Sequence, residues 1–230
     1  MRQVKNTLAL LLAWNLGLNA ATGQDAKALL GGIQAAQQQM DQELTGRLRL
    51  ENGDRVPFRL RLQPGQITYQ FDNPRETLVL NVSEPGAPLR DQVADQNLAL
   101  NGGRLLQPVR GSDLTYEDLS LRFIYWDRAT MEGEQPIRTV SCWIILVQPS
   151  TRDTQYGSVR LWVPKEGGGL LRAEGFDQKA RLIKRFEVIS GQKIGGRWWL
   201  KQVRVERFDP DTKKVVGRTY LEVNAPAAVS

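Results

Sequence analysis

A strict alternation of apolar and polar residues begins after Gly46, and it restricts the fold more than any other feature. Leucine and arginine alternate in residues 47–50, and the same period of two recurs in residues 58–62, 67–71 and 78–82. The segments between these runs have the composition of tight turns. Because successive side chains of a strand point to opposite faces, the pattern predicts an antiparallel meander with one apolar face and one arginine-rich face.

The second half of the chain continues in the same way and predicts six more strands. They are expected at about residues 137–148, 156–164, 169–177, 182–190, 195–208 and 215–223. Residues 85–110 have no regular pattern. The fold class is therefore mainly β (α+β), with about ten to eleven antiparallel strands. A sheet of that length must curl or close, because its apolar face has to be buried.

One amphipathic helix precedes the first strand and is expected to end at residues 45–46. Its apolar stripe, at helical spacing, is Leu29, Ile33, Ala36, Met40 and Leu44. Such a helix could lie on a membrane surface. Four glutamines flank the stripe with few cations near them, so packing against the concave face of the chain's own sheet is favoured.

One helix cannot fill a sheet that curls around it, so a cavity is expected, and such cavities generally hold apolar ligands. The candidate lining residues are Leu48, Leu50, Phe58, Leu60, Leu62, Tyr69, Phe71, Leu80 and Leu161 from the sheet, with Leu29, Ile33 and Met40 from the helix. The arginines expected on the opposite, wetter face are Arg47, Arg49, Arg59 and Arg61.

The residue types that are absent narrow the possible chemistry. The chain has no histidine and a single cysteine, which excludes Ser-His-Asp and Cys-His catalysis and an intramolecular disulfide. Cys142 is expected as a small buried hydrophobe, and no cofactor or metal is expected. An enzyme that uses carboxylates or a lysine remains open, with Lys184 or Lys201 as the candidate lysine. Both are better explained as structural lysines that bury their stems and keep the ammonium in solvent.

Three carboxylates gather in "GSDLTYEDLS", residues 111–120, and they first suggest a catalytic or metal site. Thr115 and Asp118 have the S/T-x-x-D/E spacing of a helix capping box. A calcium loop would need a longer alternation of oxygen ligands. We therefore expect a capped turn that leads into a strand at residues 119–126, with a weak cation site or an acidic docking patch as the alternatives.

The N-terminus has the pattern of a secretory signal. Arg2 and Lys5 precede an apolar run at residues 7–18, and small residues follow at Ala21 and Gly23. The run is shorter than the roughly 20 residues of a membrane-spanning helix. A signal peptide at 1–23 and one domain at 24–230 are expected. Removing two cations lowers the net charge from +6 to +4, and no cysteine near the cleavage site could carry a lipid anchor.

The motif "GSDLTYEDLS", the following "YW" and the segment "CWIILVQPST…KQVRVE" together resemble the outer-membrane lipoprotein-sorting protein family, relatives of the LolA-type periplasmic lipoprotein carrier. The matching elements, in family order, are residues 111–119, 161–165, 177–188 and 195–199. The resemblance covers residues 24–224 and is strongest from the first of these elements onward.

This resemblance implies a half-open barrel of about eleven antiparallel strands around helices, secreted to the periplasm. Its concave apolar face would shelter the acyl chains of a lipoprotein or lipid, and a membrane-associated donor or acceptor would be its partner. The arginine associated with the lid of the well-studied carriers has no match in the second strand region. A monomer without nucleic-acid partners is expected. A non-catalytic envelope interaction or stress-sensing module of the same fold, and a carboxylate- or lysine-dependent enzyme, are the alternatives.

Overall fold

Thirteen strands form one antiparallel sheet in the computed structural model, which describes residues 25–225 apart from 94–95, 168 and 195–196. The strands are β1 (Gln42–Arg49), β2 (Arg55–Gln63), β3 (Gln66–Phe71), β4 (Glu76–Asn81), β5 (Leu89–Val93), β6 (Gln96–Ala99), β7 (Arg128–Ile137), β8 (Val140–Gln148), β9 (Ser158–Pro164), β10 (Arg172–Phe176), β11 (Leu182–Ile194), β12 (Arg197–Phe208) and β13 (Val215–Asn224). Sequence neighbours pair throughout each half, and β1 pairs with β13 to join the halves.

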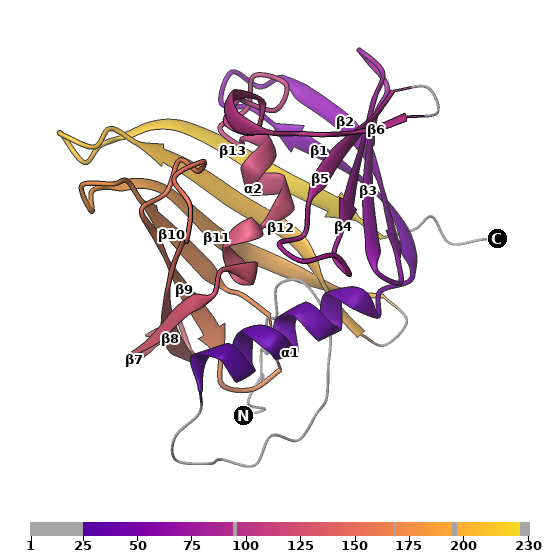
Figure 1. Ribbon diagram of the computed structural model, residues 1–230. Coiled ribbons are helices and arrows are strands. Elements are labelled where there is room, and N and C mark those ends of the chain that lie inside the picture. The colour runs from indigo at the N-terminus through magenta and orange to yellow at the C-terminus, as the bar shows by residue number, and fades with distance from the viewer. Residues whose placement is uncertain (1–24, 94–95, 168, 195–196, 226–230) are drawn as a thin grey trace, which may run out of the picture.

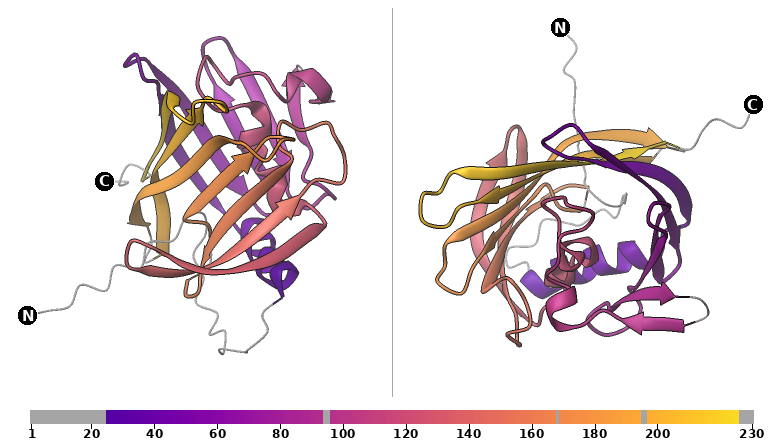
Figure 2. Two further views of the ribbon diagram at one scale, coloured as in Figure 1. Left: turned by 90° about the vertical axis from the view of Figure 1, so that its left-hand side faces the viewer. Right: turned by 90° about the horizontal axis from the view of Figure 1, so that it is seen from above.

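The sheet is open, because β6 and β7 lie at its two edges and do not pair with each other. Four helical elements accompany the sheet: α1 (Ala26–Gln38), η1 (Gly102–Arg104), α2 (Tyr116–Ser120) and η2 (Arg122–Tyr125). Figure 1 shows α1 across one end of the curl, and the view from above in Figure 2 shows the sheet wrapped around α2. The predicted curled half-barrel with an N-terminal helix is confirmed, with more strands than expected.

Residues 119–126 were predicted as a strand, and this prediction was wrong. They finish α2 and form η2, with Leu121 between them in the left-handed conformation at φ 49°. The capped turn nucleates a second helical turn instead of leading into a strand. The strand that follows is β7, and β5 and β6 lie in the region that was expected to be irregular.

The predicted end of the first helix was also wrong. Helix α1 ends at Gln38, and Leu44 already belongs to β1. The apolar residue at position 44 fits the helical spacing and the strand alternation equally well. Pairing with β2 favours the strand at this position. Gly46 lies opposite Phe58, and the two pack so closely that a Cβ at Gly46 would come within 2.4 Å of the aromatic ring.

The two faces of the β1–β2 hairpin are the predicted ones. The leucines and Phe58 are buried, whereas Arg59 and Arg61 are exposed on the convex face. The predicted signal peptide, residues 1–23, lies outside the described residues. Among the helices that are described, none is long and apolar enough to cross a membrane.

Candidate functional site: an apolar cavity and its polar wall

A partly open cavity lies between the concave face of the sheet and the α2–η2 segment. Its volume is about 780 Å³ when the solvent at its mouth is included, but only about 100 Å³ lies further than a water radius from the wall. The cavity is therefore narrow. Its lining is Phe58, Leu60, Tyr69, Leu114, Asp118, Leu119, Leu121, Phe123, Leu170, Leu171, Arg172, Ala173, Phe186, Glu187, Val188, Leu200, Val203, Val205, Leu221 and Val223.

Three of the twelve predicted lining residues, Phe58, Leu60 and Tyr69, border this cavity. The others are elsewhere. Those that are buried in the packed core are Ile33, Met40, Leu48, Leu62, Phe71, Leu80 and Leu161. Leu29 and Leu50 are half-buried and pack against the core.

Half of the lining residues come from β10–β13, which sequence reasoning did not single out. The alternation of apolar and polar residues in this half of the chain could have identified them. Val203 and Val205 of β12 point inward, as do Phe186 and Val188 of β11. The position of α2 inside the curl decides which part of the concave face stays uncovered, and no local pattern reports that position.

The predicted capping box at the start of α2 is confirmed. The Asp118 backbone N–H donates to Thr115 Oγ1 at 3.3 Å, and the Thr115 backbone N–H donates to Asp118 Oδ2 at 2.7 Å. The two residues thereby satisfy each other's backbone groups at the helix N-terminus. Asp118 is also one of the residues through which α2 contacts the sheet.

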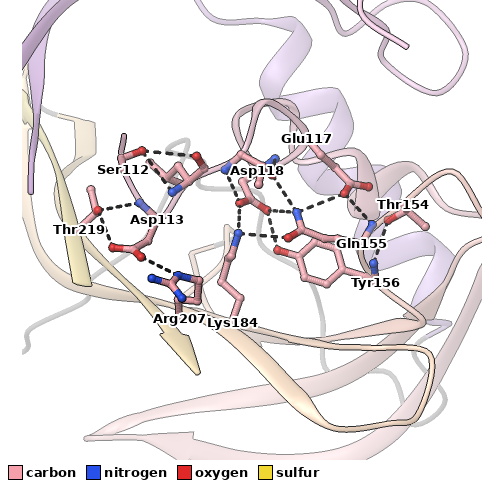
Figure 3. A network of polar contacts seen from close by, with 12 residues as sticks. Ser112, Asp113, Glu117, Asp118, Thr154, Gln155, Tyr156, Lys184, Arg207 and Thr219 are labelled. Carbon is pink, nitrogen blue, oxygen red and sulfur yellow. Dashed lines mark hydrogen bonds and ion pairs between the residues drawn. The ribbon is translucent and has the colours of Figure 1, made fainter. Parts of the chain in front are cut away.

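Lys184 of β11 donates to Asp118 Oδ2 at 2.6 Å, and the side chains are 4% and 0% exposed. Tyr156 donates its hydroxyl to the other carboxylate oxygen at 2.6 Å, and Gln155 donates to it at 3.2 Å (Figure 3). The interpretation of Lys184 as a lysine with a solvated ammonium was therefore wrong, because the whole side chain is buried and paired. Lys201 is exposed.

Glu117 is buried beside this network. Its Oε2 accepts hydrogen bonds from the Gln155 backbone N–H at 3.1 Å and from the Gln155 amide at 3.2 Å. Burial raises the pKa of the Glu117 carboxyl. Burial, followed by the nearby Asp118 charge, raises the pKa of Tyr156 well above its ordinary value. The network thus holds one ion pair beside a carboxyl and a phenol whose pKa values are both raised by burial.

Further contacts hold the rest of the 111–120 segment. Tyr69 donates to the Leu119 carbonyl at 3.3 Å, and burial raises the pKa of this tyrosine to about 12. Arg207 donates to Asp113 at 3.0 Å. Each carboxylate of the motif therefore has a partner within the protein. Across the described ranges, no group of three or more histidine, cysteine, aspartate or glutamate side chains is placed to hold a metal ion.

The fold matches solved structures over nearly its whole length. A domain assigned to outer membrane lipoprotein sorting, from Vibrio parahaemolyticus, has a TM-score of 0.67 at 15% identity and covers 90% of this chain and 95% of that one. A LolA superfamily protein from Nitrosomonas europaea has a TM-score of 0.64 at 14% identity, with 88% and 92% covered. A DUF1329 family protein from Desulfovibrio piger has 0.58 at 19%, with 89% and 95% covered.

These likenesses show a common fold, and at that level they confirm the resemblance to lipoprotein-sorting proteins. No curated protein sequence matches the chain. A family model described as "Uncharacterized protein" matches residues 94–226, which is more than half of the chain. The chain therefore belongs to this family of uncharacterized proteins, and it has a LolA-like fold.

Proposed function

We propose that this protein is an exported, non-catalytic carrier that shelters the acyl chains of a lipid or lipoprotein during sorting towards the outer membrane. The apolar cavity under α2 is the observation that supports this role. Of its lining, only Asp118, Arg172 and Glu187 are charged, and Asp118 is neutralised by Lys184. In this proposal residues 1–23 are a signal peptide, residues 24–230 form the carrier domain, and the mature protein works in the periplasm without a lipid anchor.

The shape of the cavity favours a slender ligand. Little of its volume lies more than a water radius from the wall, so a single flexible chain fits better than a fused ring system. Ligand sites of this kind gain most of their affinity from burial of apolar surface. Each buried CH₂ contributes about 0.8 kcal/mol, or roughly fourfold in affinity, so affinity should rise with chain length until the cavity is filled.

The test is a titration of the purified mature protein with fluorescent fatty-acyl probes of increasing chain length. Two adjacent residues of β2 give a matched pair of variants. Phe58→Glu places a charge in the cavity wall, whereas Arg59→Glu makes its change on the convex face, where the side chain is 52% exposed. The first variant should weaken probe binding strongly, and the second should leave it within about twofold.

A second variant avoids placing a charge in the core. Ala173 lines the cavity and is buried, and Ala173→Leu would add apolar volume there. Affinity should then stop rising at a shorter chain length, provided that circular dichroism shows an intact fold. If chain length has no effect, or if both variants of the matched pair lose binding equally, the carrier role is wrong. In that case a non-catalytic envelope interaction module of the same fold would explain the protein better.

A further inference from the structure

The convex face of the sheet has two parts in which arginine is paired differently. On β2, Arg59 contacts Asp72 at 2.8 Å and Arg61 contacts Glu43 at 3.5 Å, so each of these two arginines has its own carboxylate. On β1, on β10–β13 and at the β7–β8 turn, Glu187, Glu206 and Glu222 are each shared by two or three arginines. We call this second group the arginine cluster; its members are Arg47, Arg49, Arg138, Arg172, Arg204 and Arg218, with Glu187, Glu206 and Glu222.

Alternation places the cluster on the face opposite the cavity. Glu187 lies between Phe186 and Val188 in β11, and both of those neighbours line the cavity. The cross-strand partners of Glu187 are Arg172 on β10 and Arg204 on β12. Arg172 and Glu187 border the cavity where their strands cross its wall, and their side chains meet at 3.3 Å on the convex face.

The cluster has an excess of positive charge. Six arginines contact three glutamates, which leaves three positive charges without a carboxylate of their own among the described residues. Arg47 and Arg49 both contact Glu222 through Nε, at 2.6 Å and 3.1 Å, so neither uses its terminal nitrogens there. These forks match the geometry of phosphate oxygens.

Two guanidinium groups of the cluster also lie over aromatic rings. The Arg49 guanidinium lies 4.0 Å from the centroid of the Tyr220 ring, and that of Arg172 lies 5.4 Å from the Trp162 ring. The arginine side chains of the cluster are between 23% and 56% exposed. The cluster is therefore an ordered and accessible cationic surface that extends across five strands.

We propose that the arginine cluster docks the protein on an anionic membrane surface by binding the phosphates of lipid headgroups. A protein–protein interface would be expected to have an apolar centre within a polar rim. The exposed large apolar residues of the described chain are Val93, Leu98, Leu106, Val215 and Val216, and none of them belongs to the cluster. Charge without an exposed apolar centre suits a contact with headgroups that does not enter the hydrocarbon.

This orientation leaves the concave side facing away from the membrane surface. Only Arg172 and Glu187 of the cluster border the cavity, so docking and acyl-chain binding use largely separate surfaces. The inference does not rest on the acyl-chain carrier role, and it would hold for an interaction module of the same fold.

The test is co-sedimentation of the mature protein with vesicles of phosphatidylcholine, with and without phosphatidylglycerol, over a range of salt concentrations. The cluster variant is Arg47→Gln with Arg138→Gln. Each substitution removes one arginine but leaves the carboxylate paired, because Glu222 keeps Arg49 and Glu187 keeps Arg172. The control, Arg59→Gln with Arg61→Gln, removes the same charge from the convex face outside the cluster.

We expect binding only to vesicles that contain phosphatidylglycerol, weakening as salt rises. One arginine near such a surface contributes about fivefold, so the cluster variant should bind roughly 25-fold more weakly. The control should lose less than about threefold. Equal losses for the two variants would show an effect of net charge alone and would overturn the proposal. Binding to pure phosphatidylcholine, or absence of binding to either vesicle, would overturn it as well.

Discussion

Replacing Lys184 by methionine should destabilise the fold far more than an ordinary lysine substitution. The ammonium and the Asp118 carboxylate are both almost completely buried. Removing one partner of a buried ion pair costs about 3–5 kcal/mol, because the other charge stays buried without compensation. In Lys184→Met the carboxylate keeps hydrogen bonds from Tyr156, Gln155 and the Thr115 backbone. We therefore expect the lower end of that range, about 3 kcal/mol.

A double-mutant cycle separates the ion pair from its surroundings. Asp118→Asn alone leaves a buried ammonium, with a hydrogen bond to Gln155 Oε1 at 3.2 Å as its other contact. The double variant has no buried charge at this point, so its loss should be smaller than the sum of the single losses. Residues in direct contact show interaction energies of about 0.5–3 kcal/mol in such cycles, and we expect about 2 kcal/mol here.

Urea unfolding followed by circular dichroism measures each free energy of unfolding. Lys201→Met is the matched control, because this lysine is exposed and its replacement should change stability by less than about 0.5 kcal/mol. If Lys184→Met costs less than about 1 kcal/mol, or if the two single losses add without interaction, the buried pair does not hold α2 to the sheet.

Further predictions concern the same segment and its supports. Gly175→Ala would place a Cβ 2.1 Å from the Tyr156 ring; urea unfolding should show a loss of about 1–3 kcal/mol, and an unchanged stability would contradict this packing. Gly31→Ala adds a Cβ in open space within α1 and should raise the free energy of unfolding by up to about 1 kcal/mol; a loss would mean that α1 is packed differently. Thr115→Ala removes the cap of α2 and should cost about 1 kcal/mol, whereas no loss would deny the capping box a role in stability. Burial raises the pKa of Glu117 in the folded chain, so the folded state binds more protons and stability falls as pH rises from the unfolded to the folded pKa. Glu117→Gln should reduce that fall in unfolding curves measured across acidic pH, and an unchanged pH dependence would contradict the assignment.

Local patterns predicted the parts of the fold in which one face is buried and the other is wet. The alternation in β2 follows directly from burial of Phe58 and exposure of Arg59. The same argument fails at the sheet edges. All four residues of β6 are exposed, and β7 is exposed along most of its length. Backbone hydrogen bonds hold such strands, and any residue except proline can form these bonds. No pattern of side chains therefore indicates where an edge strand lies.

The candidate site was also predictable only in part. The capping box was predictable because Thr115 and Asp118 are three residues apart and act on each other's backbone. The partner of Asp118 was not predictable, because Lys184 lies 66 residues further along the chain. The apolar neighbours of Lys184 in β11 suggested a buried stem with a solvated ammonium. The ammonium is buried instead, because α2 lies over that strand and supplies Asp118 as its partner.

The acidic motif therefore acts through the helix that it builds. A helix of five residues does not persist on its own, because nucleation costs more than so few backbone bonds return. Asp118 caps α2 and at the same time pairs with Lys184 on the sheet, so the same carboxylate forms the helix and fixes it in place. Since α2 also forms one wall of the cavity, loss of this carboxylate should remove the helix and open the cavity in one step. The local cap and the distant lysine thus act on the same helix, and that helix forms one wall of the cavity.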